Sequence, residues 1–154
     1  MPRQSPGEIH YVANNLWRSA RPKSVEYIAK ANFKRVIDLQ SGVYELLHDD
    51  QYEFQFPCEF GIEEFNFHFS NVMPPPREKV LAAIGRIVRD EKETLVHCLH
   101  GRDRTGYLVA AYRMVVCGWG LRSACEEMMD FGFRGFPYFY WIPSLKQYQK
   151  EVAR

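Results

Sequence analysis

The segment between His97 and Gly106, HCLHGRDRTG, constrains the fold of this chain more than any other. It follows a short apolar run, TLVH, with the composition of a buried strand, and it precedes a stretch with the apolar spacing of a helix. Cys98 therefore stands at the end of a predicted strand, five residues form a turn, and a helix begins at Arg104. A strand that leads directly into a packed helix is typical of α/β domains.

The rest of the chain also alternates between strand and helix patterns. Apolar residues recur at every second position where we expect strands and at every third or fourth position where we expect helices. Strands are predicted at 9–22 (as a strand or hairpin), 35–39, 64–69 and 94–97. Helices are predicted at 24–33, where Ser24 is the expected N-cap, and at 43–50, 77–90, 104–117, 121–131 and 144–152.

This order of elements predicts a single α/β layered domain over residues 1–154. We expect a central, mostly parallel sheet of four or five strands with helices on both faces. A chain of 154 residues that is 46% apolar is sufficient for one core. Residues 1–8 are expected to be disordered, since chain ends fray unless they are packed.

The overall charge excludes some classes of partner. Basic and acidic residues nearly cancel, at 20 against 19, so no general field attracts nucleic acid or acidic lipid. The first fifteen residues lack the apolar run of a signal peptide, and no stretch is long and apolar enough for a membrane span. We therefore predict a cytoplasmic protein without a membrane segment, in which any attraction for anions is local.

Four cysteines are scattered along the chain without a CxxC pair. This distribution fits neither a disulfide scaffold nor a zinc site, and it suits a reducing compartment. We expect no metal and no cofactor. Cys117 and Cys125 are interpreted as inert core residues.

The turn after Cys98 has the features of an anion-binding loop. Successive N–H groups of such a turn can point at one phosphate, and the helix that follows adds the positive end of its dipole. Gly101 permits the sharpest bend, and Arg104 supplies a planar fork that can grip two phosphate oxygens. Thiols beside a helix N-terminus and an arginine are commonly ionised, so Cys98 is the expected nucleophile.

Two neighbours of the loop are expected to support this chemistry. Thr105 can donate its hydroxyl to the sulfur, and His97 can orient the loop through backbone hydrogen bonds. The glycines Gly101 and Gly106 also suggest a nucleotide-binding loop, but the required Lys and Ser or Thr do not follow them. We therefore reject the nucleotide-binding interpretation.

The sequence HCLHGRDRT resembles the HCxxGxxR(S/T) signature of protein tyrosine and dual-specificity phosphatases, and the small size suits the latter. NLWRSARP at 15–22 and FKRVIDLQ at 33–40 are similar to the LYRSG and TVIDLR segments of bacterial tyrosine and lipid phosphatases, and of fungal and plant atypical dual-specificity enzymes. The resemblance implies a metal-independent hydrolase that cleaves phosphate monoesters through a phosphocysteine intermediate. It also implies that Cys58 could form a protective disulfide with Cys98 upon oxidation, as in some relatives.

The general acid departs from the usual pattern of these phosphatases. They take a proton from an aspartate on a separate loop, but the corresponding residues 69–74 contain no acid. Asp103 is similar to the in-loop aspartate proposed as the acid in myotubularins, Sac-type phosphatases and some bacterial enzymes. The alternative is that Asp103 only shapes the turn. The remaining candidate donors are Asp49, Asp50, Glu63 and Glu64.

Several further residues are candidates for substrate contact. Basic side chains in the loop resemble those of enzymes that act on inositol phosphates, although they could equally be solvated. The two arginines of WRSARP line the cleft or pair with carboxylates elsewhere. The candidates are Leu99, His100, Gly101, Arg102, Arg18 and Arg21. The aromatic residues between 131 and 141 are expected to form core, with some of them on one wall of the cleft.

Taken together, these features predict a phosphatase that acts on an inositol polyphosphate, such as phytate, or on a phosphoinositide headgroup. A phosphotyrosine or dual-specificity protein phosphatase, acting on a phosphoprotein, is the alternative. A pseudophosphatase that binds phosphorylated partners without turnover is more remote, because Cys98, Arg104 and Thr105 are all present.

Overall fold

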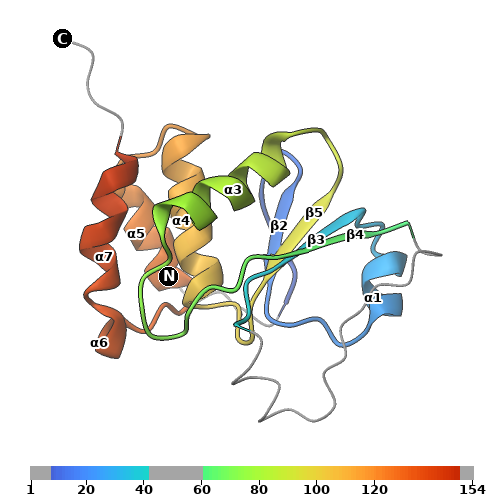
Figure 1. Ribbon diagram of the computed structural model, residues 1–154, viewed down its shortest axis with the longest axis horizontal. Helices are drawn as coiled ribbons and strands as arrows, with labels where there is room; N and C mark the ends of the chain where they lie inside the picture. The colour runs from blue at the N-terminus through green and yellow to red at the C-terminus, as the bar shows by residue number, and fades with distance from the viewer. Residues whose placement is uncertain (1–7, 42–60, 150–154) are drawn as a thin grey trace.

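A five-stranded sheet forms the centre of the protein. The structure is a computed structural model that describes residues 8–41 and 61–149 (Figure 1). The strand order is β1-β2-β5-β3-β4. The strands are β1 (His10–Ala13), β2 (Leu16–Ser19), β3 (Arg35–Asp38), β4 (Glu63–Asn66) and β5 (Thr94–His97).

The sheet is parallel except at one edge. Strand β5 is central and pairs in parallel with β2 and β3, so that His97 lies between Ser19 and Asp38. Strand β1 pairs antiparallel with β2 through a tight hairpin at Asn14, whose φ of 52° lies in the left-handed region that asparagine tolerates. The predicted mostly parallel sheet and the predicted hairpin are both confirmed.

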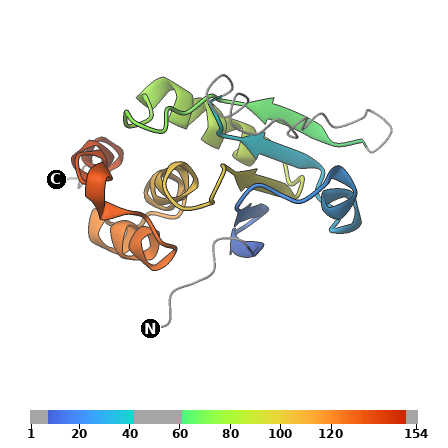
Figure 2. The ribbon, with the colours of Figure 1, turned by 90° about the horizontal axis from the view of Figure 1, so that it is seen from below.

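Helices cover both faces of the sheet (Figures 1 and 2). Helix α1 lies on one face, whereas α3 and α4 cover the other and α5 to α7 form a further layer beyond α4. The helical segments are α1 (Val25–Lys30), α3 (Arg77–Val88), α4 (Arg104–Val115), α5 (Leu121–Asp130), α6 (Gly135–Tyr138), α7 (Trp141–Ser144) and the 3₁₀ turn η2 (Leu145–Tyr148). Ser24 caps α1 as predicted, because its hydroxyl accepts from the N–H of Tyr27 at 3.1 Å.

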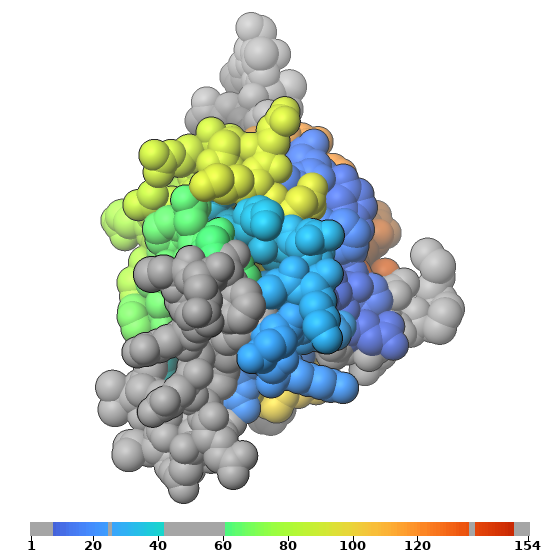
Figure 3. All heavy atoms as spheres, turned by 90° about the vertical axis from the view of Figure 1, so that its right-hand side faces the viewer, coloured from blue at the N-terminus to red at the C-terminus, as the bar shows by residue number. Residues whose placement is uncertain are grey.

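Alternation along the strands divides the apolar side chains between two cores. Val36 and Leu95 face a small core beneath α1, where Ile28 is fully buried. Figure 3 views this side, with α1 and the start of β3 between the β1–β2 hairpin and β4. Ile37 and Val96, one residue further along each strand, face the larger core on the helical side.

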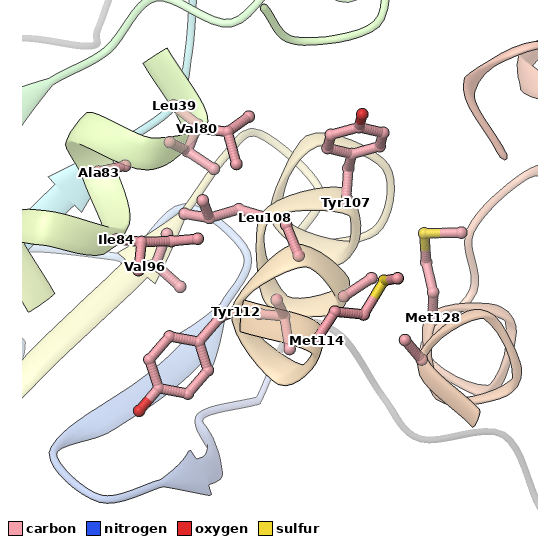
Figure 4. Packing of buried hydrophobic residues seen from close by; sticks show 14 of the residues in the cluster. Leu39, Val80, Ala83, Ile84, Val96, Tyr107, Leu108, Tyr112, Met114 and Met128 are labelled. Atoms are coloured by element: carbon pink, nitrogen blue, oxygen red, sulfur yellow. The ribbon is translucent and has the colours of Figure 1, made fainter. Parts of the chain in front are cut away.

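Helix α4 runs through the middle of the larger core. Ten of its twelve residues are buried, because the sheet and α3 lie on one side of it and α5 on the other. Figure 4 shows Leu108 directed toward Val80 and Ile84, while Met114 faces Met128 of α5. A helix enclosed in this way holds its first residue, Arg104, in a fixed position.

Two predicted boundaries require correction. Strand β4 ends at Asn66 rather than residue 69, because His68 has a φ of 49° that breaks the extended backbone. The last helix was expected at 144–152, but short helical turns already begin at residue 135, winding the aromatic run so that Trp141 is fully buried against Tyr107. The helix predicted at 43–50 and residues 150–152 lie outside the described residues.

The amino ends of the parallel strands are joined by an ion-pair network. The Arg35 side chain is 2% exposed and lies 2.8 Å from Asp90 and 3.2 Å from Glu63. Arg35 also donates to the carbonyl of Arg86 at 2.7 Å, and Lys92 pairs with Glu63 at 2.8 Å.

None of the helices within residues 8–41 and 61–149 combines the length and apolar character needed to cross a bilayer.

Candidate active site

The loop between β5 and α4 lies at the carboxyl end of the sheet, at the lower edge in the view of Figure 1. Gly101 has a φ of 71°, which allows the loop to reverse and which other residues adopt only with strain. Among the described residues, no backbone N–H from Leu99 to Asp103 donates to another protein group. These N–H groups are available to a bound anion.

Cys98 lies at the base of a small pocket and is 2% exposed. The Thr105 hydroxyl donates to Cys98 Sγ across 3.0 Å, as the sequence led us to expect. A hydroxyl in this position stabilises negative charge on the sulfur. The residues that line the pocket are Asn71, Cys98, His100, Asp103, Arg104, Arg134, Tyr138 and Trp141.

His97 is completely buried beneath the loop. Its Nδ1 lies 3.4 Å from the carbonyl oxygen of Cys98, which suits the predicted orienting role. Burial, together with the nearby charges of Arg21 and Arg104, lowers the pKa of His97 to about 3. The imidazole is therefore neutral at physiological pH and takes no part as a proton donor there.

Asp103 lines the pocket, but its carboxylate is already bound by Arg134. Oδ1 accepts from the Arg134 backbone N–H at 2.9 Å, and Oδ2 accepts from Arg134 Nε at 2.9 Å, with Nη2 at 2.8 Å. Partial burial disfavours the charged form of Arg134, but the hydrogen bonds that Arg134 donates to Asp103 outweigh this effect and raise the pKa of the guanidinium above its ordinary value. Arg134 thus occupies both carboxylate oxygens of Asp103.

His100 lines the pocket as predicted, but it contributes less positive charge than we expected. Partial burial of the imidazole and the nearby charges of Arg102, Arg134 and Arg104 lower its pKa. His100 is consequently neutral near pH 7 and can act as a hydrogen-bonding group.

Arg18 lies behind the loop, and it is not among the described residues that line the pocket. It is 1% exposed and donates through Nη2 to the carbonyl oxygen of Gly101 at 3.1 Å, with its guanidinium carbon 3.9 Å from the centre of the Phe131 ring. Burial lowers the pKa of Arg18 to about 10, although Glu127 and Cys98 oppose this effect. Arg18 therefore remains a cation at neutral pH.

The other predicted contact residues are placed around the loop rather than in the pocket. The N–H of Arg21 donates to the carbonyl of Leu99 at 3.3 Å, which fixes the start of the loop. The stem of Arg102 lies against Gly132, where an added Cβ would come within 3.1 Å of Arg102 Cδ. Within the part of the chain that the structure describes, the pocket lining does not include Leu99, Arg21 or Arg102.

The remoter acid candidates divide into two groups. Glu63 lies at the amino end of β4, where Arg35 and Lys92 hold its carboxylate, so it is at the opposite end of the sheet from Cys98. Glu64 follows it on the same strand. Asp49, Asp50 and Cys58 lie outside the described residues.

No group of three or more His, Cys, Asp or Glu residues suited to a metal ion occurs within residues 8–41 and 61–149.

Sequence reasoning missed Arg134 and Asn71 and only partly anticipated the aromatic wall. Tyr138 and the buried Trp141 do line the pocket, in agreement with the expected cleft wall. Arg134 carried a signal, because it is the one charged residue between 131 and 145 in a run rich in aromatic residues and glycine. Asn71 carried none, since a lone asparagine after a strand is common in turns.

Comparison with known proteins places this geometry in a family. The model of the dual specificity phosphatase catalytic domain matches residues 17–151. The chain is 30% identical over 129 residues to the dual specificity protein phosphatase TpbA of Pseudomonas aeruginosa, covering 81% of this chain and 55% of TpbA. It is 27% identical over 127 residues to the inositol diphosphatase DSP3 of Arabidopsis thaliana, covering 79% and 61%. The chain thus spans less than two thirds of the length of these curated relatives.

Solved structures share the fold. The chain is similar to Tk-PTP in its active form, with a TM-score of 0.74 and 22% identity over 94% of this chain and 97% of that one. It is also similar to the core catalytic domain of the PP-IP phosphatase SIW14 from S. cerevisiae, with a TM-score of 0.71 and 22% identity over 97% and 88%. The family model covers most of the sequence, and this chain therefore belongs to the dual specificity phosphatase catalytic-domain family.

Proposed function

We propose that this chain is a metal-independent phosphatase that hydrolyses phosphate monoesters through a phosphocysteine. The observation that carries the proposal is the 3.0 Å hydrogen bond from Thr105 to Cys98 Sγ inside a turn whose N–H groups are available to an anion. The hydroxyl favours the thiolate, and the N–H groups and Arg104 face the charge that develops on the phosphoryl oxygens. These three elements are what a two-step displacement requires.

In the first step the Cys98 thiolate attacks phosphorus in line with the leaving group. The S–P bond forms as the P–O bond breaks, and the leaving oxygen keeps the electron pair. In the second step water attacks phosphorus, the S–P bond breaks, and inorganic phosphate leaves while the thiolate is restored. Thr105 assists here because its hydrogen bond stabilises sulfur as the departing anion.

We further propose an inositol polyphosphate as the substrate. The preferred bond is the phosphoanhydride of an inositol diphosphate, where Cys98 attacks the terminal phosphorus and the ring-bound phosphate leaves. Asp103 is the one carboxylate among the described residues that line the pocket, and it is paired with Arg134. An alkoxide needs a proton as it leaves, whereas a phosphate leaving group is far less basic and does not. The names of the relatives DSP3 and SIW14, an inositol diphosphatase and a PP-IP phosphatase, support the same class.

The alternative substrate is a phosphotyrosine protein. A phenoxide is also a weakly basic leaving group, and the relative TpbA is named a dual specificity protein phosphatase. The pocket favours the inositol class because Arg104 and Arg134 both line it, and a ring with several phosphates offers each of them an anion. A phosphoinositide headgroup shares this chemistry.

The test is phosphate release, with a chelator present, from diphosphoinositol pentakisphosphate, inositol hexakisphosphate, phosphoinositide vesicles and a phosphotyrosine peptide. We expect the diphosphate to be cleaved fastest and Cys98→Ser to abolish all release. Cys117→Ser, which removes a half-buried thiol on another part of the fold, is the matched control and should retain activity. Cleavage of the peptide alone would assign the chain to the protein phosphatases, and activity in Cys98→Ser would refute the mechanism.

A further inference from the structure

Two residues, Tyr138 and Asp103, hold the Arg134 side chain at the phosphate pocket. Its Nη2 donates to the Tyr138 hydroxyl at 3.2 Å, and its guanidinium carbon lies 5.1 Å from the centre of the Tyr138 ring. Its Nε and Nη2 reach Asp103 Oδ2. These contacts keep a guanidinium fork beside Cys98 and Arg104, on the same pocket.

The contact between Asp103 and Arg134 has a fixed part and an exchangeable part. The backbone N–H of Arg134 donates to Oδ1 at 2.9 Å and stays in place wherever the side chain moves. The Arg134 side chain is 44% exposed, whereas that of Asp103 is 9% exposed. The exposed guanidinium can therefore turn to a new partner while Asp103 Oδ1 keeps the hydrogen bond from the Arg134 backbone N–H.

A phosphate is a better partner for this fork than a carboxylate that lies beneath it. Arginine binds phosphate through two parallel N–H···O bonds, and a phosphate dianion carries more charge than Asp103. A ligand with one phosphate in the loop and a second beside it would bring that second group to Arg134.

We infer that Arg134 is the specificity-determining residue for a second phosphate of the ligand, and that it exchanges Asp103 for that phosphate when the ligand binds. This inference deepens the proposed function and rests on it for the position of the first phosphate in the loop. After the exchange, Asp103 keeps the hydrogen bond that the Arg134 backbone N–H donates to Oδ1.

Binding to a catalytically inactive protein tests the exchange without relying on turnover. In a Cys98→Ser background, titration calorimetry with orthophosphate, pyrophosphate and inositol hexakisphosphate gives three dissociation constants. We expect Arg134→Gln to weaken binding of the two polyphosphates tenfold or more and to change orthophosphate binding by a clearly smaller factor. Arg134→Lys should show an intermediate loss, since it keeps the charge without the fork. Arg122→Gln, whose side chain is 93% exposed on α5, should change none of the three constants.

A variant of the other partner in the ion pair, Asp103→Asn, tests the direction of the change in affinity. Asp103→Asn removes the competing carboxylate, so polyphosphate binding should tighten relative to orthophosphate, and this gain should disappear in the Asp103→Asn/Arg134→Gln double variant. Equal weakening of all three ligands by Arg134→Gln, or a gain in Asp103→Asn that persists without Arg134, would overturn the inference. Thermal melting of each variant separates misfolding from lost binding. Absence of inositol turnover by the wild type would refute the proposed substrate but not the measured selectivity for a second phosphate.

Discussion

The two ends of the same sheet use arginine in opposite ways. At the amino end, Arg35 and Lys92 are balanced by Glu63 and Asp90 at distances between 2.8 and 3.2 Å. At the carboxyl end, the described lining of the pocket contains Arg104 and Arg134 against one carboxylate, Asp103, and the buried cation Arg18 lies behind the loop. Carboxylates neutralise the basic side chains at the amino end, so we interpret that end of the sheet as structural. The described lining at the carboxyl end has more basic than acidic side chains, which suits it to bind anions.

The largest expected effect comes from changing the shape of a cation at the carboxyl end while keeping its charge. Arg104→Lys retains a positive group at the start of α4 but loses the planar fork. We expect kcat/KM for p-nitrophenyl phosphate to fall about 100- to 1,000-fold, because the fork follows the phosphoryl oxygens into the transition state. Steady-state kinetics measure the loss, and a decrease below about threefold would show that charge alone is sufficient.

The Arg18→Met variant tests whether a buried cation behind the loop contributes to kcat/KM as a cation inside the loop does. Arg18→Met removes the hydrogen bond to the Gly101 carbonyl and a positive charge close to Cys98. We expect kcat/KM to fall about 10- to 100-fold, since small shifts of a binding loop have effects of this size. Alkylation of Cys98 by iodoacetamide at neutral pH should slow as well, which distinguishes an effect on the thiolate from an effect on substrate binding. Normal alkylation and turnover would limit Arg18 to packing.

Arg35→Met is the matched change at the amino end of the sheet. It leaves the carbonyl of Arg86 and the carboxylates of Asp90 and Glu63 without their shared donor. We expect the free energy of unfolding to decrease by about 2 to 3 kcal/mol, measured by urea denaturation. The kcat of the folded variant should stay within about twofold of wild type, because the network lies at the other end of the sheet from Cys98. A large loss of kcat would remove the distinction between the two ends.

The carboxyl end also contains a buried group that gives a pH dependence. The pKa of His97 is about 3 in the folded protein, against 6.5 ordinarily, because burial disfavours the imidazolium. The unfolded chain therefore takes up a proton below pH 6.5 that the folded chain refuses until about pH 3. Stability from this residue is complete above pH 6.5 and is lost as the pH falls, by about 2 kcal/mol at pH 5.

Urea denaturation at pH 7.5 and pH 5.0 measures this loss. Wild type should lose about 2 kcal/mol more than His97→Gln between the two values, since glutamine does not titrate. Equal losses in the two proteins would mean that His97 is protonated in the folded state.

The sequence predicted the local part of this molecule well. The bounds of β5 agree at both ends, and the turn and the start of α4 follow directly from the same short segment. Local spacing is sufficient there because a buried strand, a tight turn with a glycine and a helix start each depend on neighbouring residues. The contact between Thr105 and Cys98 followed for the same reason, since the two residues are seven apart.

What the sequence did not predict depends on contacts between distant residues. Arg18 lies 83 residues from the Gly101 carbonyl that it binds, and Arg134 lies 31 residues from Asp103. An arginine in a strand pattern predicts neither its burial nor its partner, so the sequence left Arg18 between the cleft and a pairing elsewhere. Similarly, the paired state of Asp103 depends on how the turn after α5 packs against the loop, which no local pattern describes.

The most direct test of the whole account is to trap the proposed intermediate. Wild type and Thr105→Ala are mixed with p-nitrophenyl phosphate in the presence of a chelator and quenched with acid within the first turnovers, and the peptide that contains Cys98 is analysed by mass spectrometry. We predict one phosphoryl group on Cys98, at higher occupancy in Thr105→Ala because departure of the sulfur is slower without the hydroxyl. Turnover that proceeds at the wild-type rate in Cys98→Ser, with no phosphoryl group on this peptide in the wild type, would contradict the account.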